Sequence, residues 1–307
     1  GGNIGGMNPN QSAAQEVAVD TSGASAERQT GGVTINYIQR DGGNTFKSYS
    51  FFTYGGEGLA SSNLTDRIKQ GPYGALGATV TGLSAENRLL KTWEVNPGIG
   101  GPIAKDKLWF YYALRYQRAD DTAANMFVNK NAFDLNQFTY SPDTSQQALS
   151  RHAFYSDSQL RLTWQANAKN KFAGTWDQQQ YCQCPNGISA TTAPEAANDR
   201  RFPVQQLTHA EWFSTVTSRL LVEFVGLHRT ERWGNMELRT SDSSPMWGAF
   251  GGSLDAANFA AYNRAIGVTE QNAVGIMPAN LVYRGPSGLW NTNWVPSYHY
   301  RGAVSYV

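Results

Sequence analysis

The chain has 307 residues, and its 25 lysines and arginines against 24 aspartates and glutamates leave a net charge of +1. This balance excludes a general nucleic-acid binder, because no basic excess exists to face phosphates. Aromatic residues make up 12% of the chain and glycine contributes 31 residues, a composition that favours β-structure. The longest apolar runs, such as Leu108 to Leu114, are far shorter than the ~20 residues that a membrane helix needs.

Alternation of apolar and polar residues is the strongest signal along the chain. Leu160, Leu162 and Trp164 interleave with polar residues, which predicts a strand with one apolar and one polar face. Similar or less regular segments bring the expected number to about eight strands. They cover residues 47–54, 89–95, 108–119, 159–167, 172–182, 204–214, 220–233 and 298–306.

The expected connections alternate between very short and very long. Tight turns are predicted at 104–107, 168–171 and 216–219, and long loops at 55–86, 120–155, 183–203 and 234–296. Outer-membrane barrels combine short periplasmic turns with long external loops, whereas compact soluble domains rarely carry several loops beyond ~15 residues. Tryptophans near strand ends are candidates for an interfacial belt. They are Trp109, Trp164, Trp176, Trp212 and Trp233.

The N-terminal 45 residues differ in character, with two short expected strands at 15–20 and 31–40 separated by small residues. The runs Gln15–Glu27, Thr30–Asn36 and Arg40–Phe46 resemble the end of the plug domain of TonB-dependent outer-membrane receptors, Oar-like branch. Residues 96–110, with Gly-Gly-Pro-Ile-Ala-Lys-Asp-Lys-Leu-Trp-Phe at their end, are similar to a hairpin of that branch. Arg40-Asp41 and Lys47-Ser48 depart from the family pattern.

The resemblance implies an all-β fold: a partial antiparallel transmembrane β-barrel (46–307) preceded by the C-terminal part of a plug domain (1–45). It also implies residence in the outer membrane of a Gram-negative-type bacterium, in contact with lipid, and energised uptake of a scarce nutrient. The small ligand is unknown: an iron chelate, an oligosaccharide or a peptide. A TonB-type energy-coupling protein would act through an N-terminal segment that we expect to be missing. The family barrel resembles a 22-stranded structure, so we expect this chain to be a fragment.

Two cysteines, Cys182 and Cys184, are two positions apart. They predict a disulfide at the base of a loop or two inert thiols, since neither a second cysteine pair nor a His-x-x-x-His motif completes a zinc site. No metal and no cofactor is expected. The Gly-x-Ser-x-Gly elbow of serine hydrolases is absent, so no catalytic residue is proposed and the protein is not expected to be an enzyme.

Aromatic and arginine side chains of the longest expected loop are the candidate ligand contacts, although such aromatics more often pack against one another. They are Trp247, Tyr262, Tyr283, Trp290, Trp294, Arg264 and Arg284. Two other hypotheses stay open. One is a self-contained binding or adhesive β-protein, either a soluble sandwich or a small barrel closed by pairing 47–54 with 297–307. The other is an enzyme, such as a hydrolase, with a site assembled from loops.

Overall fold

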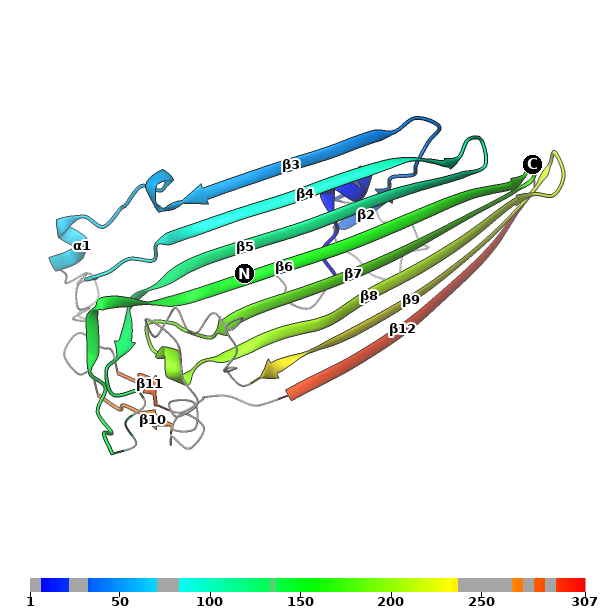
Figure 1. Cartoon of the computed structure of the whole chain (residues 1–307). Coiled ribbons are helices and arrows are strands. Elements are labelled where there is room, and N and C mark those ends of the chain that lie inside the picture. Colours follow the sequence, from blue (N-terminus) through cyan, green and yellow to red (C-terminus); the bar gives the residue numbers. More distant parts are fainter. Residues whose placement is uncertain are drawn as a thin grey trace.

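A computed structural model describes residues 7–21, 33–70, 83–132, 134, 136–236, 267–272, 279–284 and 291–306. The fold is all-β and antiparallel, built around one large sheet (Figure 1). The strands of that sheet are β3 (Lys47–Gly56), β4 (Leu89–Ala104), β5 (Leu108–Asn129), β6 (Pro142–Asn167), β7 (Asn170–Asn186), β8 (Asn198–Thr215), β9 (Leu220–Met236) and β12 (Asn291–Tyr306). The smaller elements are η1 (Gln11–Ala13), β1 (Ala14–Asp20), β2 (Thr34–Gln39), η2 (Glu57–Leu59), α1 (Asp66–Gln70), η3 (Pro194–Ala196), β10 (Val268–Thr269) and β11 (Val282–Tyr283).

The eight strands follow one another across the sheet in the order β12-β9-β8-β7-β6-β5-β4-β3. Each strand therefore pairs with its neighbours along the chain, as in an up-and-down meander. All eight strands expected from alternation are present. The three tight turns lie together at one end of the sheet, and the described parts of the long connections lie at the other (Figure 1).

Several strands are longer than the alternation predicted. Residues 120–129 and 142–155, expected in a loop, continue β5 and β6 as a paired hairpin with Phe127 opposite Gln147. Residues 183–186 and 198–203 likewise extend β7 and β8. Alternation fails there because neighbouring residues share one environment: Met126 and Phe127 are both buried, whereas Ser145 and Gln146 are both exposed.

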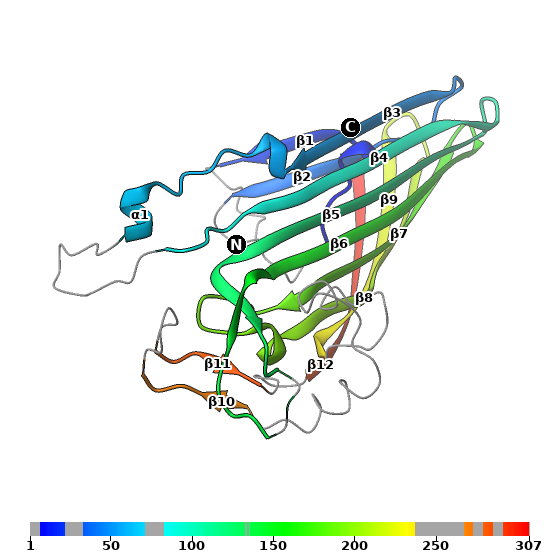
Figure 2. The same cartoon turned by 60° about the vertical axis from the view of Figure 1, so that its left-hand side comes forward.

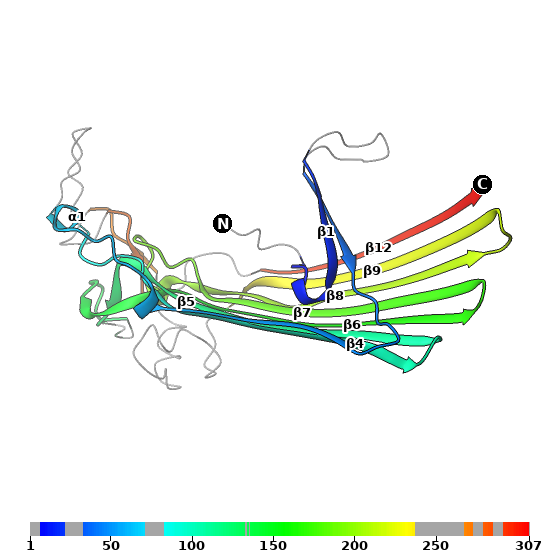
Figure 3. The same ribbon diagram turned by 90° about the horizontal axis from the view of Figure 1, so that it is seen from above.

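The sheet is open, because β3 and β12 stand at its opposite ends and do not pair with each other in the described part of the chain. This contradicts the small barrel closed by pairing 47–54 with 297–307. The sheet is also twisted and curved, as the turned views show (Figures 2 and 3).

The N-terminal elements form a separate antiparallel pair, with Val17 of β1 opposite Tyr37 of β2. This confirms the two short strands expected there. The pair rises from one side of the large sheet (Figure 3), and η1 lies against that side. No helix among the described residues is long and apolar enough to cross a membrane.

Candidate functional site

The two faces of the large sheet are reversed relative to a soluble protein. The face toward β1 and β2, called here the inner face, buries polar side chains. Among them are Asn96, Asp157, Gln159, Thr163, Thr175, Asp177, Gln179 and Gln205. The opposite, outer face exposes large apolar side chains such as Trp164 (49% exposed) and Trp176 (40%). A water-soluble sheet buries its apolar face instead, so the outer face requires an apolar environment.

An aromatic row crosses the outer face beside the tight turns. The cross-strand pairs are Trp164 with Phe172, Phe172 with Trp212, and Trp212 with Phe224. The ring centroids of the first two pairs lie 5.5 and 6.4 Å apart. Aromatic rows at this level are typical of the interfacial girdles of outer-membrane barrels.

Three of the five tryptophans predicted for such a belt lie outside this row. Trp176 is on the outer face, but it lies opposite Thr208, four residues from Phe172 along β7. Trp109 faces the inner side, where its indole N–H donates to Asn44 Oδ1 at 2.8 Å. Trp233 stacks on the buried ring of Phe202, with the ring centroids 5.9 Å apart. Trp109 and Trp233 stand at positions that alternate with the outer-face residues of their strands, so both belong to the inner face. The alternation decides which face a side chain lies on, whatever its distance from the end of the strand.

The N-terminal segment, residues 8–13, is held on the inner face by hydrogen bonds from three strands. The backbone N–H of Asn8 donates to Gln179 Oε1 of β7, and Gln179 Nε2 donates to the Asn8 carbonyl oxygen, both at 3.0 Å. The hydroxyl of Tyr155 also donates to the Asn8 carbonyl at 2.9 Å. One turn further on, Tyr111 donates to the Ser12 carbonyl at 2.7 Å. We call these contacts the first anchor.

The second anchor holds residues 39–41, which precede β3. The guanidinium of Arg161 donates to Asp41 Oδ1 at 2.6 Å and to Gln39 Oε1 at 3.0 Å. The Thr163 hydroxyl also donates to Asp41, at 2.9 Å. Although burial raises the pKa of Asp41, the hydrogen bond and charge of Arg161 outweigh burial and hold that pKa below its usual value. Asp41 is therefore an ionised partner of Arg161.

A glycine of β4 lets the segment approach the sheet closely at the first anchor. A Cβ added to Gly98 would lie 2.6 Å from the Tyr111 hydroxyl and 3.3 Å from the Ser12 Cβ. The hydroxyl could then no longer reach the Ser12 carbonyl without a shift of the segment. Gly98 thus belongs to the contact between segment and sheet.

At the other end of the sheet, described parts of the long connections pack together into what we call the outer cap. Its apolar core joins the extensions of β5 and β6 to the connections that contain residues 188–197 and 281–283. The buried residues of this core are Ala123, Met126, Ala148, Ile188, Ala193, Ala197, Leu281 and Tyr283.

Glu195 of η3 is fully buried at the centre of this cap and accepts a 2.7 Å hydrogen bond from Asn129 Nδ2 of β5. Its carboxylate also faces the backbone N–H of Arg284, at 3.4 Å. Burial raises the pKa of Glu195, while Asn129 and Arg284 oppose that rise. Glu195 thus ties three stretches of the chain together.

The predicted ligand contacts fall into three groups. Tyr283 and Arg284 belong to the cap and are each 1% exposed. The Tyr283 hydroxyl donates to the Phe138 carbonyl, and the Arg284 guanidinium lies 4.0 Å from the centroid of the Phe138 ring. Trp294 is 61% exposed, and it lies in β12 rather than in the expected loop. The other four, Trp247, Tyr262, Arg264 and Trp290, lie outside the described residues. The structure therefore buries Tyr283 and Arg284 in the cap, whereas Trp294 is exposed on β12.

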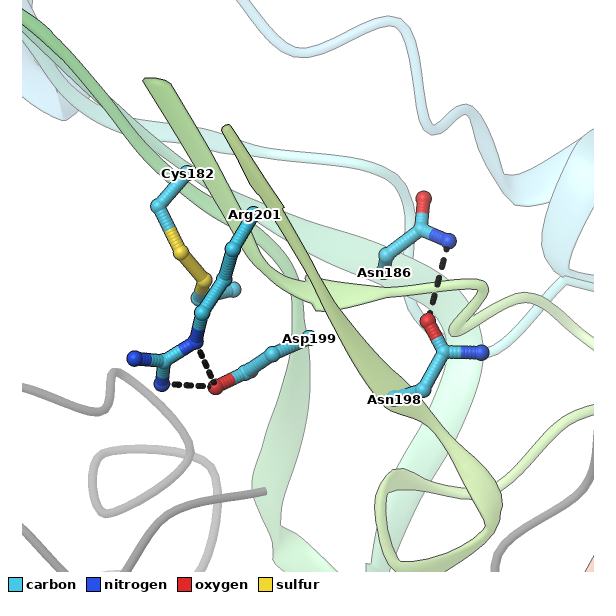
Figure 4. The surroundings of a disulfide bond; sticks show 6 residues. Cys182, Asn186, Asn198, Asp199 and Arg201 are labelled. Atoms are coloured by element: carbon cyan, nitrogen blue, oxygen red, sulfur yellow. Dashed lines mark hydrogen bonds and ion pairs between the residues drawn. A yellow bond between two sulfur atoms is a disulfide. The ribbon is translucent and has the colours of Figure 1, made fainter. Parts of the chain in front are cut away.

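The cysteine pair lies near the outer end of β7. Cys182 and Cys184 form a disulfide, with Cα atoms 5.5 Å apart, and both residues are buried (Figure 4). Beside it Arg201 pairs with the fully buried Asp199 (Figure 4). No group of three or more histidine, cysteine or acidic side chains among the described residues is arranged to hold a metal ion.

Sequence reasoning missed the residues that form the anchors and the cap: Asn8, Tyr111, Arg161, Gln179 and Glu195. Each acts as a single polar residue with a partner far along the chain, so no local motif marks it. The alternation could have located some of them in part. It places Tyr111, Arg161 and Gln179 on the same face as the polar residues of their strands.

Comparison with curated proteins finds similarity over part of the chain. A 99-residue stretch, 32% of this chain, is 33% identical to the TonB-dependent transporter Oar of Myxococcus xanthus and covers 8% of that protein's length. No protein-family model matches the chain. No solved structure matches it either. The chain is thus distantly similar, over about a third of its length, to a TonB-dependent transporter.

Proposed function

We propose that this chain is part of a TonB-dependent receptor of the outer membrane. Residues 46–307 form consecutive strands of the barrel wall, and residues 1–45 form the end of the plug. The observation that carries the proposal is the reversal of the two sheet faces: polar side chains are buried under the N-terminal segment, while aromatic and aliphatic ones are exposed. Acyl chains of lipid would cover the outer face, as in other barrels of this membrane.

The strand lengths support this proposal. A transmembrane strand needs ~9–11 residues, whereas β5 and β6 have 22 and 26. The aromatic row marks one interface beside the tight turns, so the excess length projects beyond the membrane on the side of the outer cap. The short turns would then face the periplasm and the cap the exterior.

The free edges of β3 and β12 support a larger barrel. Each has an unpaired side in the described sheet, and a strand edge in lipid leaves backbone N–H and C=O groups without partners. We propose that further strands of the same receptor pair with both edges, which makes this chain a fragment of a longer wall.

The proposed activity is passage of a scarce nutrient through the barrel, without catalysis. A TonB-type energy-coupling protein would act through a segment outside this chain and displace the plug from the anchors described above. The similarity to a TonB-dependent transporter supports this role. The cargo class stays among an iron chelate, an oligosaccharide and a peptide.

Sidedness is tested with single cysteines on whole cells. Gln146 is exposed in the outer part of β6 and Ser218 is exposed in a tight turn, so Gln146→Cys and Ser218→Cys form a matched pair. A membrane-impermeant maleimide should label Cys at 146 on intact cells, and Cys at 218 only after the outer membrane is permeabilised. Equal labelling of both on intact cells, or of neither after permeabilisation, would contradict the proposed orientation.

Uptake is tested with a strain that lacks the gene. Growth is compared on media limited for a chelated iron source, for an oligosaccharide or for a peptide, with a strain lacking the energy-coupling protein alongside. We expect both strains to share a defect on one of the three media. Normal growth of the gene-deletion strain on all three would contradict uptake of these cargo classes.

A further inference from the structure

Two acidic side chains are buried at the first anchor without a donor for most of their oxygens. Asp157 of β6 and Asp177 of β7 are 1% and 6% exposed. They are diagonal neighbours on the inner face, because Asp157 lies opposite Gln179 and Asp177 lies opposite Gln159. Among the described residues, no hydrogen bond of ordinary geometry reaches either oxygen of Asp157 or Oδ1 of Asp177. Two ionised carboxylates offer acceptors only, so they have nothing to donate to each other.

The charged and titratable groups around the pair do not neutralise it. The charge of Arg115 of β5 acts on Asp157, but its guanidinium is held by both carboxylate oxygens of Glu94 of β4, at 2.7 and 3.3 Å. The hydroxyl of Tyr155 donates to the Asn8 carbonyl and not to the pair. Two negative charges in such a site are costly, whereas one bound proton removes a charge and supplies the missing donor.

The same residues hold the N-terminal segment. Gln179 Nε2 donates both to Asp177 Oδ2, at 3.2 Å, and to the Asn8 carbonyl, at 3.0 Å. The side chain of Asn10, itself buried, lies next to Asp157. Asn10, Asp177 and Gln179 also line a cavity of about 240 Å³ between the segment and the sheet. Lifting the segment would open this cavity and give the carboxylates water.

We propose that Asp157 and Asp177 share one proton and that this proton latches residues 8–13 onto the inner face. Loss of the proton leaves two neighbouring charges, which are relieved when the segment lifts and water enters. The latch therefore holds at low pH and loosens as the pH rises. This inference goes beyond the proposed function, because it concerns how the segment is retained, whatever the cargo is.

The test is hydrogen exchange of the intact protein in lipid bilayers from pH 5 to pH 9, corrected for the chemical exchange rate at each pH. A one-proton linkage changes an equilibrium by up to about tenfold per pH unit. In the wild-type protein, protection of residues 8–13 should fall by that factor per unit through the titration. Asp157→Asn, which keeps the shape of the protonated acid, should make this protection independent of pH.

The matched control is Asp66→Asn, which changes a carboxylate that is 88% exposed on α1 and should follow the wild type. Asp177→Asn serves as the second variant, and unchanged protection of β7 and β8 shows that each variant is folded. Wild-type protection that does not change with pH would overturn the proposal, as would a wild-type pH dependence retained by both variants. Protection that depends on added calcium or on a chelator at fixed pH would also overturn it, because a metal ion would then occupy the site.

Discussion

Arg161 should couple residues 39–41 to the large sheet with a measurable energy. Its guanidinium contacts both Asp41 and Gln39, and the same group also reaches Glu211 of β8 at 3.3 Å. Removing Arg161 alone would therefore disturb the sheet as well as the anchor. A double-mutant cycle of Arg161→Met and Asp41→Asn isolates the contact between the two side chains.

The expected coupling follows from the exposure of the pair. Hydrogen bonds to charged groups contribute about 1.5–3 kcal/mol. The Asp41 side chain is 35% exposed, and it keeps its bond from Thr163 and a 3.7 Å approach of Lys171 when Arg161 is lost. Solvent screening and these remaining partners place the coupling at the lower end, about 1.5 kcal/mol.

Native-state hydrogen exchange of the β2 amides measures this coupling directly. The free energy of opening should fall in each single variant, and the double variant should lose about 1.5 kcal/mol less than the sum of the two. Thr163→Val, which removes a neutral donor to the same carboxylate, is the comparison and should show a smaller coupling. Additive effects of Arg161→Met and Asp41→Asn, within ~0.3 kcal/mol, would refute the second anchor.

The second anchor should also respond to pH in the opposite sense from the Asp157–Asp177 latch. Because the pKa of Asp41 is lowered in the folded protein, ionised Asp41 stabilises the contact above its ordinary pKa, and that stability is lost as the pH falls through the lowered value. Protection of residues 34–40 should therefore stay constant from pH 5 to pH 8 and fall only below about pH 4. A loss of protection between pH 6 and pH 8 would contradict this assignment.

Three further outcomes are expected from the outer face and the cap. Thr208 lies on the outer face four residues from the aromatic row, and Thr208→Arg should cost about 2–4 kcal/mol of folding free energy in bilayers. Val216→Arg, in a tight turn, should cost under about 0.5 kcal/mol. Equal costs of the two variants would argue against lipid contact. Glu195→Ala should destabilise the cap by about 2–4 kcal/mol and expose residues 187–197 to proteolysis, because the buried Asn129 amide and the Arg284 backbone N–H lose their acceptor. Glu195→Gln keeps an acceptor oxygen and should be much milder; unchanged cleavage in Glu195→Ala would argue against its central role. Replacing both Cys182 and Cys184 by serine should cost at most about 1.5 kcal/mol by denaturant unfolding, because the closed loop is short; a loss above about 3 kcal/mol would contradict that reasoning.

The strands were predictable because the part of each one nearer the tight turns obeys a simple alternation. Leu160, Leu162 and Trp164 point outward and Arg161 and Thr163 point inward, as the sequence alone indicates. The extensions of β5 and β6 escaped prediction because the alternation ends where the cap begins. There the strands are held by backbone pairing and by cap residues such as Met126 rather than by one apolar face.

The functional contacts were less accessible to sequence reasoning. Tyr283 and Arg284 have the composition of ligand contacts, yet the same residue types serve equally well inside a packed cap, and only three-dimensional burial separates the two roles. Arg161 and Asp41 are 120 positions apart, and nothing local to either residue identifies the other. The tight turns, by contrast, were found because short connections are a local property.

The most direct test of the central claim compares two adjacent residues of β12. His299 of β12 lies opposite Leu227 of β9, and Leu227 lies opposite His209 of β8. His209 in turn lies opposite Thr175 of β7, which is buried on the inner face. Residues opposite one another share a face, so His299 belongs to the inner face. Tyr300 has the other parity and belongs to the outer face. Nitroxide labels at His299→Cys and Tyr300→Cys are measured in bilayers with oxygen and with a water-soluble nickel chelate. We predict that oxygen dominates relaxation at 300 and the nickel chelate at 299. Nickel-dominated relaxation at both positions would contradict an outer face in contact with lipid.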